Sequence, residues 1–252
     1  MRIDLLDRLS KRGDTFTVED ALKICDIDRT ALWVILSRLE RRGWIERIEK
    51  GKYLIIPLGA EKGGYTSHEF VIGSLLVDPY CIAYWSALNF YGLTEQIPAT
   101  VFIQTTSRKK KQEIEVFGVL YRIVRVKRDK FFGVRREWLE ESAINITDKE
   151  KTIVDCLDKP QYCGGVVEVA RALKDPGLDN AKLSEYATSI GNSGVVRRLG
   201  YLCERLGLDI DLPPIETRNY LLLDPTIPKK GSTSAEWKLV INLDDKMLGG
   251  LE

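Results

Sequence analysis

The sequence predicts an α+β protein: a small N-terminal domain of three helices and a hairpin, followed by a larger mixed α/β domain with strands first and helices later. Over residues 1 to 56, apolar side chains recur at helical spacing and then alternate at period two. A glycine-containing stretch at residues 59 to 64 follows Pro57 and is typical of a joint between domains. We therefore expect the N-terminal domain at residues 1–58 and the second domain at residues 65–252.

The three N-terminal helices have recognisable starts and stops. The first, from residue 3, should end at Gly13. Thr17 stands directly before a valine and two acids, so it is the expected N-cap of a short second helix. Asp28 is placed to cap a third helix over residues 29 to about 42, and Gly43 is its natural C-terminal stop.

The third helix has an unusual outer surface. Four apolar side chains at helical spacing, Leu32, Ile35, Leu36 and Leu39, form the face that it must bury. The other side presents aromatic, hydroxyl and guanidinium groups, with no acid before Glu40. Such groups suit the major groove of DNA, where they can meet base edges and thymine methyl groups. The candidates for contacts to base edges are Arg29, Thr30, Trp33, Ser37 and Arg38.

Residues 44 to 56 alternate on both sides of Lys50-Gly51, which predicts a β-hairpin with a basic tip. Three helices followed by such a hairpin make a winged helix-turn-helix, and the candidates for phosphate contacts are Arg41, Arg47, Lys50 and Lys52. Because one such domain touches few base pairs, a homodimer on an inverted repeat is expected. The alternative is a protein-docking module that binds no DNA, since 12 basic and 10 acidic residues over residues 1 to 57 leave a modest charge of +2.

The pattern beyond residue 65 predicts the elements of the second domain. The expected helices lie at residues 69–76, 83–91, 148–157, 166–173, 181–190 and 195–206. Strands are expected at residues 101–105, 114–117, 120–126, 130–135, 144–146, 220–223 and 237–243. Thr147 is the expected cap of the helix at residues 148–157, with Glu150 in capping-box position.

Charge is segregated along the second domain, although the whole chain carries only +1. Residues 104 to 136 hold eleven bases and three acids, and residues 137 to 190 hold eleven acids and six bases. The basic candidates are Arg108, Lys109, Lys110, Lys111, Arg122, Arg125, Lys127 and Arg128. Two interpretations stay open for them: a surface that grips nucleic acid, or a solvated segment that pairs with the acidic region.

No catalytic constellation and no cofactor or metal motif is visible in the sequence. The five cysteines are scattered without a CxxC pair, and His68 is the single histidine, at an expected helix start. Asp148, Glu150 and Asp155 could be imagined as a nuclease metal cluster, but helix capping and pairing with lysine explain them better. We therefore expect no enzyme. Neither a signal peptide nor an apolar run of the roughly 18 residues needed to cross a bilayer is present, so a cytoplasmic protein without membrane contact is expected.

Several segments, in order, resemble the AbiEi-like antitoxins of type IV toxin–antitoxin systems, also described as predicted transcriptional regulators of viral defence systems. The first runs from Arg29-Thr-Ala-Leu-Trp33 to Trp44-Ile-Glu-Arg-Ile48, and the second is Tyr84-Trp-Ser-Ala-Leu-Asn-Phe-Tyr-Gly-Leu-Thr94. Val124-Arg-Val-Lys127, Phe131-Phe-Gly133, Ile146-Thr-Asp-Lys-Glu-Lys-Thr-Ile-Val-Asp-Cys-Leu-Asp158 and Gly164-Gly165 follow. The resemblance spans roughly residues 1 to 206, and the segment after Leu212 matches nothing in the family.

This resemblance implies a protein with two functions. The winged domain would repress its own operon by binding inverted repeats in the promoter. The C-terminal domain would antagonise a nucleotidyltransferase-like toxin without forming a stable complex with it. The resemblance carries no residue-level site, so the DNA-contact residues above rest on helix geometry alone. A nucleic-acid-acting enzyme with a nuclease-like second domain remains the alternative from another class.

Overall fold

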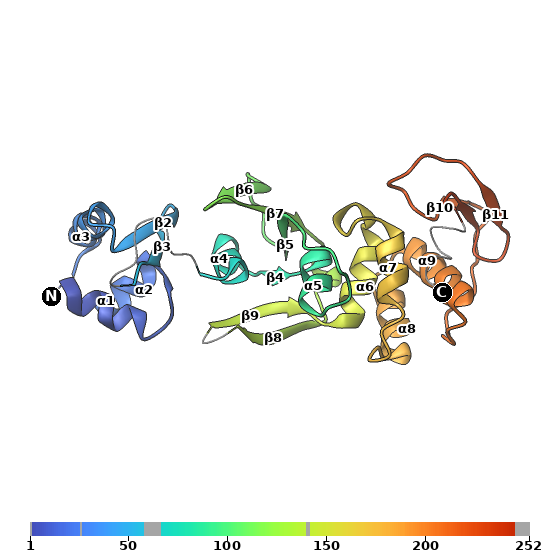
Figure 1. The fold of residues 1–252 in the computed structure, drawn as a ribbon, viewed down its shortest axis with the longest axis horizontal. Coiled ribbons are helices and arrows are strands. Elements are labelled where there is room, and N and C mark those ends of the chain that lie inside the picture. The colour runs from blue at the N-terminus through green and yellow to red at the C-terminus, as the bar shows by residue number, and fades with distance from the viewer. Residues whose placement is uncertain (1, 26, 58–66, 140–141, 245–252) are drawn as a thin grey trace.

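The computed structural model describes residues 2–25, 27–57, 67–139 and 142–244. The expected joint at residues 59 to 64 lies outside these residues. Figure 1 shows an elongated molecule in which the N-terminal domain, a mixed sheet, a group of helices and a small C-terminal sheet follow one another along the long axis. The α+β class and the order of the parts agree with the prediction.

The N-terminal domain contains α1 (Arg2–Ser10), β1 (Thr15–Thr17), α2 (Val18–Ile24), α3 (Arg29–Arg41), β2 (Ile45–Glu49) and β3 (Lys52–Ile55). Its sheet has the order β1-β3-β2, with both pairs antiparallel. Leu32, Leu36 and Leu39 of α3 are buried in a core with α1, α2 and the sheet. The predicted hairpin is confirmed, and β1 is a strand that the sequence pattern did not reveal.

The helix starts of this domain are fixed by local hydrogen bonds. Thr17 Oγ1 accepts from the backbone N–H of Asp20 at 3.1 Å, and Asp20 Oδ2 accepts from the backbone N–H of Thr17, which completes a capping box. Asp28 Oδ1 accepts from Ala31 N at 2.9 Å and caps α3. Gly43, at φ 71°, follows the last helical turn, a backbone angle that glycine adopts without a Cβ clash. These residues confirm the expected start and end of α3.

The second domain begins with α4 (Glu69–Leu76), which is followed by a six-stranded mixed sheet. One of the connections between its strands contains α5 (Tyr84–Phe90). Its strands are β4 (Cys81–Ile82), β5 (Thr100–Thr105), β6 (Glu113–Val116), β7 (Val119–Arg125), β8 (Val134–Leu139) and β9 (Ser142–Thr147). They lie in the order β6-β7-β5-β4-β9-β8, with β5–β7 and β4–β9 parallel. The outermost strand β8 is exposed along most of its length, and Trp138 is 63% exposed with the guanidinium of Arg136 over its ring.

Helices cover both faces of this sheet. Val101 and Ile103 of β5 pack with α4 in one apolar cluster. Phe102, between them in sequence, packs on the other face with α5 and with α6 (Lys149–Asp158). Because neighbouring side chains of a strand point to opposite faces, the near-continuous apolar run at residues 101 to 103 is explained by burial on both sides.

The remaining helices are α7 (Val166–Ala172), α8 (Asn180–Ser189) and α9 (Ser193–Leu206). After them comes a small sheet of β10 (Leu221–Leu222), β11 (Ser232–Ser234) and β12 (Leu239–Ile241), in the order β10-β12-β11. Leu223, Leu239 and Ile241 are buried in the same cluster as α5, α6 and α9. The segment after Leu212 is therefore a packed part of the second domain.

Several local predictions for the second domain are wrong. Residues 130 to 133 are not a strand: a short 3₁₀ helix (Arg128–Lys130) and a loop precede β8. Asp148, not Thr147, caps α6, because its Oδ1 accepts from Lys151 N at 2.8 Å. Glu150 forms no capping box and instead accepts from Asp179 N and Lys182 Nζ. Thr147 Oγ1 lies 2.7 Å from Thr152 Oγ1 inside the domain.

Gly200 provides a stability test of the contact between α9 and the C-terminal segment. A Cβ at this position would overlap the ring of Trp237, whose Nε1 donates to Glu204 Oε2 at 2.5 Å. Glycine to alanine in a helix normally stabilises by up to about 1 kcal/mol. Here we expect Gly200→Ala to destabilise by about 1–3 kcal/mol through overpacking, measured by urea denaturation. The cost should largely disappear in a Trp237→Leu background; an equal cost there would show that the ring is not responsible.

Candidate nucleic-acid interface

The outer surface of α3 is built as its sequence predicts. Arg29, Thr30, Ser37, Arg38 and Arg41 are exposed, and they project from the side of the helix opposite its buried leucines. Trp33 is half-buried, since part of its ring packs against the domain core. Exposed Val34 adds apolar surface among the polar groups. The helix therefore presents to solvent the mixture of donors and apolar atoms that base edges require.

A hollow of about 210 Å³ lies between α3, the start of α2 and the hairpin tip. Its lining includes four of the predicted contact residues, Arg29 and Trp33 of α3 and Lys50 and Lys52 of the hairpin, together with Gly51 at the tip. The backbone N–H of Val18 donates to Gly51 O at 2.9 Å and holds the tip beside α2. The structure thus brings four of the nine candidates, two from the helix and two from the hairpin, to one hollow.

Acidic side chains modify this site in a way that the sequence pattern does not reveal. Glu19 lies in the hollow and its Oε1 is 3.1 Å from Arg29 Nη2. Glu49 Oε2 is 3.0 Å from Lys52 Nζ, and Lys52 is only 25% exposed. Lys50 and Arg47 remain exposed. Lys50 is therefore a cleaner probe of phosphate contact than Lys52, whose loss would also disturb the hairpin.

The hairpin also contacts the second domain. Lys109 Nζ lies 3.0 Å from Glu49 Oε1 and donates to the carbonyl of Leu76, toward which Lys52 Nζ is also directed at 3.4 Å. Burial opposes ionisation of Glu49, but hydrogen bonds from Lys52 and Lys109 hold its pKa below the ordinary value. Ile48, Leu54 and Ile56 belong to the same apolar cluster as α4. The hairpin is thus attached to the second domain by both apolar and charged contacts.

The other basic residues of the second domain have different environments. Arg108, Lys110, Lys111, Arg125, Lys127 and Arg128 are exposed. Arg122 pairs with Glu113 on the neighbouring strand and lies over the ring of Tyr162 at 5.8 Å. Lys130 reaches the acidic region, with its Nζ 2.9 Å from Asp158 Oδ2. Pairing between the basic and acidic regions thus accounts for Lys130, while most of the basic surface stays open to solvent.

The three acids considered as a nuclease metal cluster, Asp148, Glu150 and Asp155, form ion pairs with lysines. Lys182 Nζ lies 3.0 Å from Asp148 Oδ2 and 2.9 Å from Glu150 Oε2. Burial opposes protonation of Lys182, but these two carboxylates raise its pKa. Asp155 pairs with Lys151, whose side chain is fully buried. Within the described ranges, no three His, Cys, Asp or Glu side chains lie close enough together to hold a metal ion.

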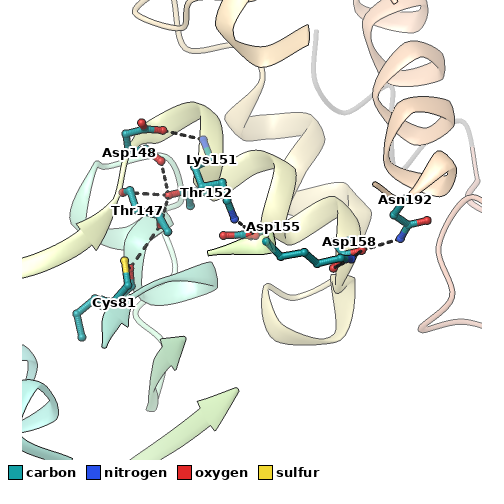
Figure 2. A network of polar contacts seen from close by, with 10 residues as sticks. Cys81, Thr147, Asp148, Lys151, Thr152, Asp155, Asp158 and Asn192 are labelled. Atoms are coloured by element: carbon teal, nitrogen blue, oxygen red, sulfur yellow. Dashed lines mark hydrogen bonds and ion pairs between the residues drawn. The ribbon is translucent and has the colours of Figure 1, made fainter. Parts of the chain in front are cut away.

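Figure 2 shows that these groups form a structural network rather than an open site. Asp148 stands at the start of α6, Lys151 points along the helix to Asp155, and Asp158 meets Asn192 at the start of α9, with Asn192 Nδ2 2.6 Å from Asp158 Oδ1. Burial raises the pKa of Asp155, against the effect of Lys151. The network ties α6 to the strand before it and to α9.

His68 caps a helix, and four of the five cysteines are buried. His68 is the N-cap of α4, with its Nδ1 accepting from Phe70 N at 3.1 Å. Cys81, Cys156, Cys163 and Cys203 are buried thiols, and Cys25 is half-buried. Burial raises the pKa of Cys81, Cys156 and Cys203, so these thiols stay protonated.

The three helices and the hairpin of the N-terminal domain have the arrangement of a winged helix-turn-helix. Residues 4–56 match the family model described as "Transcriptional regulator, AbiEi antitoxin". This match confirms, over the N-terminal domain, the resemblance drawn from α3 and the hairpin. Over this segment the chain is similar to AbiEi antitoxin regulators.

The whole fold has a counterpart of known structure. The crystal structure of the Rv2827c protein from Mycobacterium tuberculosis superimposes with a TM-score of 0.65 at 15% sequence identity, over 98% of this chain and 92% of that one. At this identity the likeness concerns the fold alone. No curated protein sequence matches the chain. Among the described helices, none is long and apolar enough to cross a bilayer.

Proposed function

We propose that this protein is a DNA-binding transcriptional repressor and antitoxin of a type IV toxin–antitoxin system, acting in the cytoplasm. The observation that carries the proposal is the position of Arg29 and Trp33 of α3 and Lys50 and Lys52 of the hairpin around one hollow, in a domain similar to AbiEi regulators. The winged domain binds inverted repeats in its own promoter, as a homodimer on the DNA. The second domain antagonises a nucleotidyltransferase-like toxin without a stable complex.

Helix α3 and the hairpin contact different parts of the DNA, the base edges and the phosphates. Five side chains of α3 enter the major groove, where hydrogen-bonding groups distinguish base pairs. They are Arg29, Thr30, Trp33, Ser37 and Arg38. Arg41 and the hairpin cations Arg47, Lys50 and Lys52 bind phosphates, which fix the register without reading sequence. Contacts to phosphates release counterions, so affinity should fall steeply with salt.

A gel-shift titration against the DNA upstream of its own gene tests the repressor function. We expect a shift that resists unrelated duplex competitor and weakens steeply between about 50 and 200 mM salt, by on the order of a thousandfold for six phosphate contacts. A shift that unrelated duplex removes completely, or no shift, would favour the protein-docking alternative. A mirrored half-site arrangement in the footprint, one helical turn or a multiple apart, would support the homodimer.

The antitoxin function is expected to survive loss of DNA binding. We expect the full-length Arg38→Ala/Arg41→Ala variant to lose repression of a promoter reporter but to neutralise co-expressed toxin as wild type does. This separation follows because both arginines are exposed on α3, outside the second domain. Loss of neutralisation at unchanged protein level would contradict the assignment of antitoxin activity to the second domain.

A nuclease function of the second domain has no comparable support. The three carboxylates on which it would depend are occupied by Lys151 and Lys182. We therefore propose a regulator and antitoxin rather than a nuclease.

A further inference from the structure

Strand β8 is an edge of the mixed sheet, at the opposite side from β6. Among the described residues its backbone pairs with β9 on one side and with no strand on the other. Figure 1 shows β8 along the lower rim of the sheet, away from β6. A free strand edge has a row of backbone N–H and C=O groups, to which an extended segment of another chain can bind as an added strand.

One face of β8 carries exposed side chains of the kinds that protein interfaces favour. Val134, Arg136 and Trp138 share this face, because alternate residues of a strand point the same way. Val134 is 39% exposed and Trp138 is 63% exposed. The guanidinium carbon of Arg136 lies 5.3 Å from the centre of the Trp138 ring. Tryptophan and arginine are among the residues most enriched at the energetic centres of interfaces.

The Trp138 ring is oriented by its neighbour and yet left uncovered. Its partner across the ladder is Ala143 of β9, whose methyl group is too small to cover an indole ring. The guanidinium of Arg136 attracts the ring and restricts its rotation. A ring that is already oriented loses less conformational freedom when a ligand covers it. Trp138 is therefore an aromatic anchor at the edge of the sheet.

Two adjacent arginines determine the charge that a bound segment needs. Arg135 and Arg136 are both exposed, and because they are consecutive in a strand they point to opposite faces of the sheet. Arg135 Nε lies 3.6 Å from Glu137 Oε1, which offsets part of its charge. A partner strand with two consecutive acids would place one carboxylate beside each arginine, and opposite charges on neighbouring strands stabilise their pairing.

We propose that the β8 edge, with Trp138 as its anchor, binds an extended acidic segment of another protein as an added strand. The segment carries two consecutive acids opposite Arg135 and Arg136, and apolar side chains opposite Val134 and Trp138. The inference goes beyond the proposed function and does not require that the winged domain bind DNA.

A protein segment of this composition fits the edge better than a nucleic acid or a second copy of the chain. Nucleic acids have no amide groups to continue the backbone hydrogen bonding of β8. The other edge strand, β6, has its acids at Glu113 and Glu115, which share one face and cannot meet arginines on both faces. A second β8 would bring arginines of its own to the edge.

Two fluorescein-labelled peptides test this pattern with the full-length protein. One contains Tyr-Thr-Glu-Glu-Val, for a strand antiparallel to β8, and the other contains the reverse order, for a parallel strand. Control peptides have lysines in place of both glutamates. In anisotropy titrations we expect an acidic peptide to bind and the lysine peptides to bind about tenfold more weakly or less, since like charges on neighbouring strands destabilise pairing. Equal binding of acidic and lysine peptides would overturn the proposal.

Trp138→Ser tests the anchor. We expect this variant to lose about tenfold or more in affinity for the acidic peptide, since truncation of a central aromatic residue is among the largest losses at interfaces. The matched control is Tyr220→Ser, which removes another exposed aromatic ring with a lysine over it, from the C-terminal segment. The control should bind the peptide as wild type does. Equal losses in the two variants would contradict the assignment to β8.

Charge reversal and hydrogen exchange test the arginines and the added strand. Arg135→Glu/Arg136→Glu should bind the lysine peptides and reject the acidic ones, and it should stay folded because both arginines are exposed. Bound acidic peptide should slow amide hydrogen exchange over residues 134–139 of wild type. Binding without this slowing would show that no strand is added to β8.

Two other outcomes would overturn the proposal by assigning the edge to a different occupant. Sedimentation velocity without peptide tests for self-association, and self-association that Trp138→Ser abolishes would assign the edge to a second copy. Displacement of the acidic peptide by an oligothymidylate, with loss of oligothymidylate binding in Trp138→Ser, would assign it to nucleic acid.

Discussion

Alanine at both Arg38 and Arg41 is expected to reduce affinity for the operator by on the order of 100-fold or more. Both arginines are exposed on the outer face of α3, one turn apart. Arg38 is proposed to contact a base edge, where a good bidentate contact to guanine is worth about 1–3 kcal/mol, and Arg41 to contact a phosphate. Arg41 also reaches back to Ser37 O at 3.4 Å, so its guanidinium stays close to the helix. Anisotropy with labelled operator and unrelated duplex measures both affinity and specificity.

The control is Arg8→Ala/Arg12→Ala, which removes two exposed arginines from α1 and the residues after it in the same domain. Figure 1 places α1 away from α3, so this variant should keep specific binding and lose little affinity. Equal losses in the two variants would mean that charge alone matters and would remove α3 as the helix that reads bases. Circular dichroism melting should show both variants folded, since exposed arginines contribute little to stability.

The largest expected effect on stability comes from Lys151. Its ammonium is fully buried, pairs with Asp155 and lies 4.7 Å from the centre of the Phe132 ring. Lys151→Met should therefore destabilise the second domain by about 3–5 kcal/mol, because it leaves the Asp155 carboxylate buried without its partner. Urea denaturation followed by fluorescence measures the change.

A second variant separates the loss of charge balance from the loss of packing. Lys151→Met/Asp155→Leu removes both charges and keeps apolar volume, so it should recover most of the lost stability. Recovery of the fold with unchanged operator binding would identify the pair as structural. A double variant no more stable than Lys151→Met would mean that packing around the lysine stem, rather than the unpaired carboxylate, dominates.

Local features of the fold could be predicted from the sequence because they depend on neighbouring residues. Thr17 and Asp28 cap helices through groups three residues away, and the hairpin around Lys50-Gly51 follows from alternation. Strands β1 and β4 are three and two residues long, too short to show a period. They exist because β3 and β5 offer them hydrogen-bonding edges, which no local pattern encodes.

The same distinction applies to the candidate site. The exposed face of α3 could be predicted from helical periodicity, and the structure places it as expected. The partners of its cations could not, because Glu19 comes from α2 and the Glu49–Lys109 pair joins residues 60 positions apart. Charge segregation left two interpretations open, pairing with the acidic region or an exposed basic surface; the structure shows pairing at Lys130 and leaves Arg108 exposed.

The outermost strand β8 has a consequence for crowded conditions in the cell. Its backbone pairs with β9 on one side only among the described residues, and such an unpaired row of N–H and C=O groups can template polymerisation. Two neighbouring arginines, Arg135 and Arg136, stand in this row. If the β8 strand of a second molecule paired antiparallel with this one, centred on Arg136, the two Arg136 guanidinium groups would lie opposite each other and lose bound water. The like charges would repel, which opposes growth of a fibre. Arg135 and Arg136 are therefore expected to oppose edge-to-edge aggregation through β8.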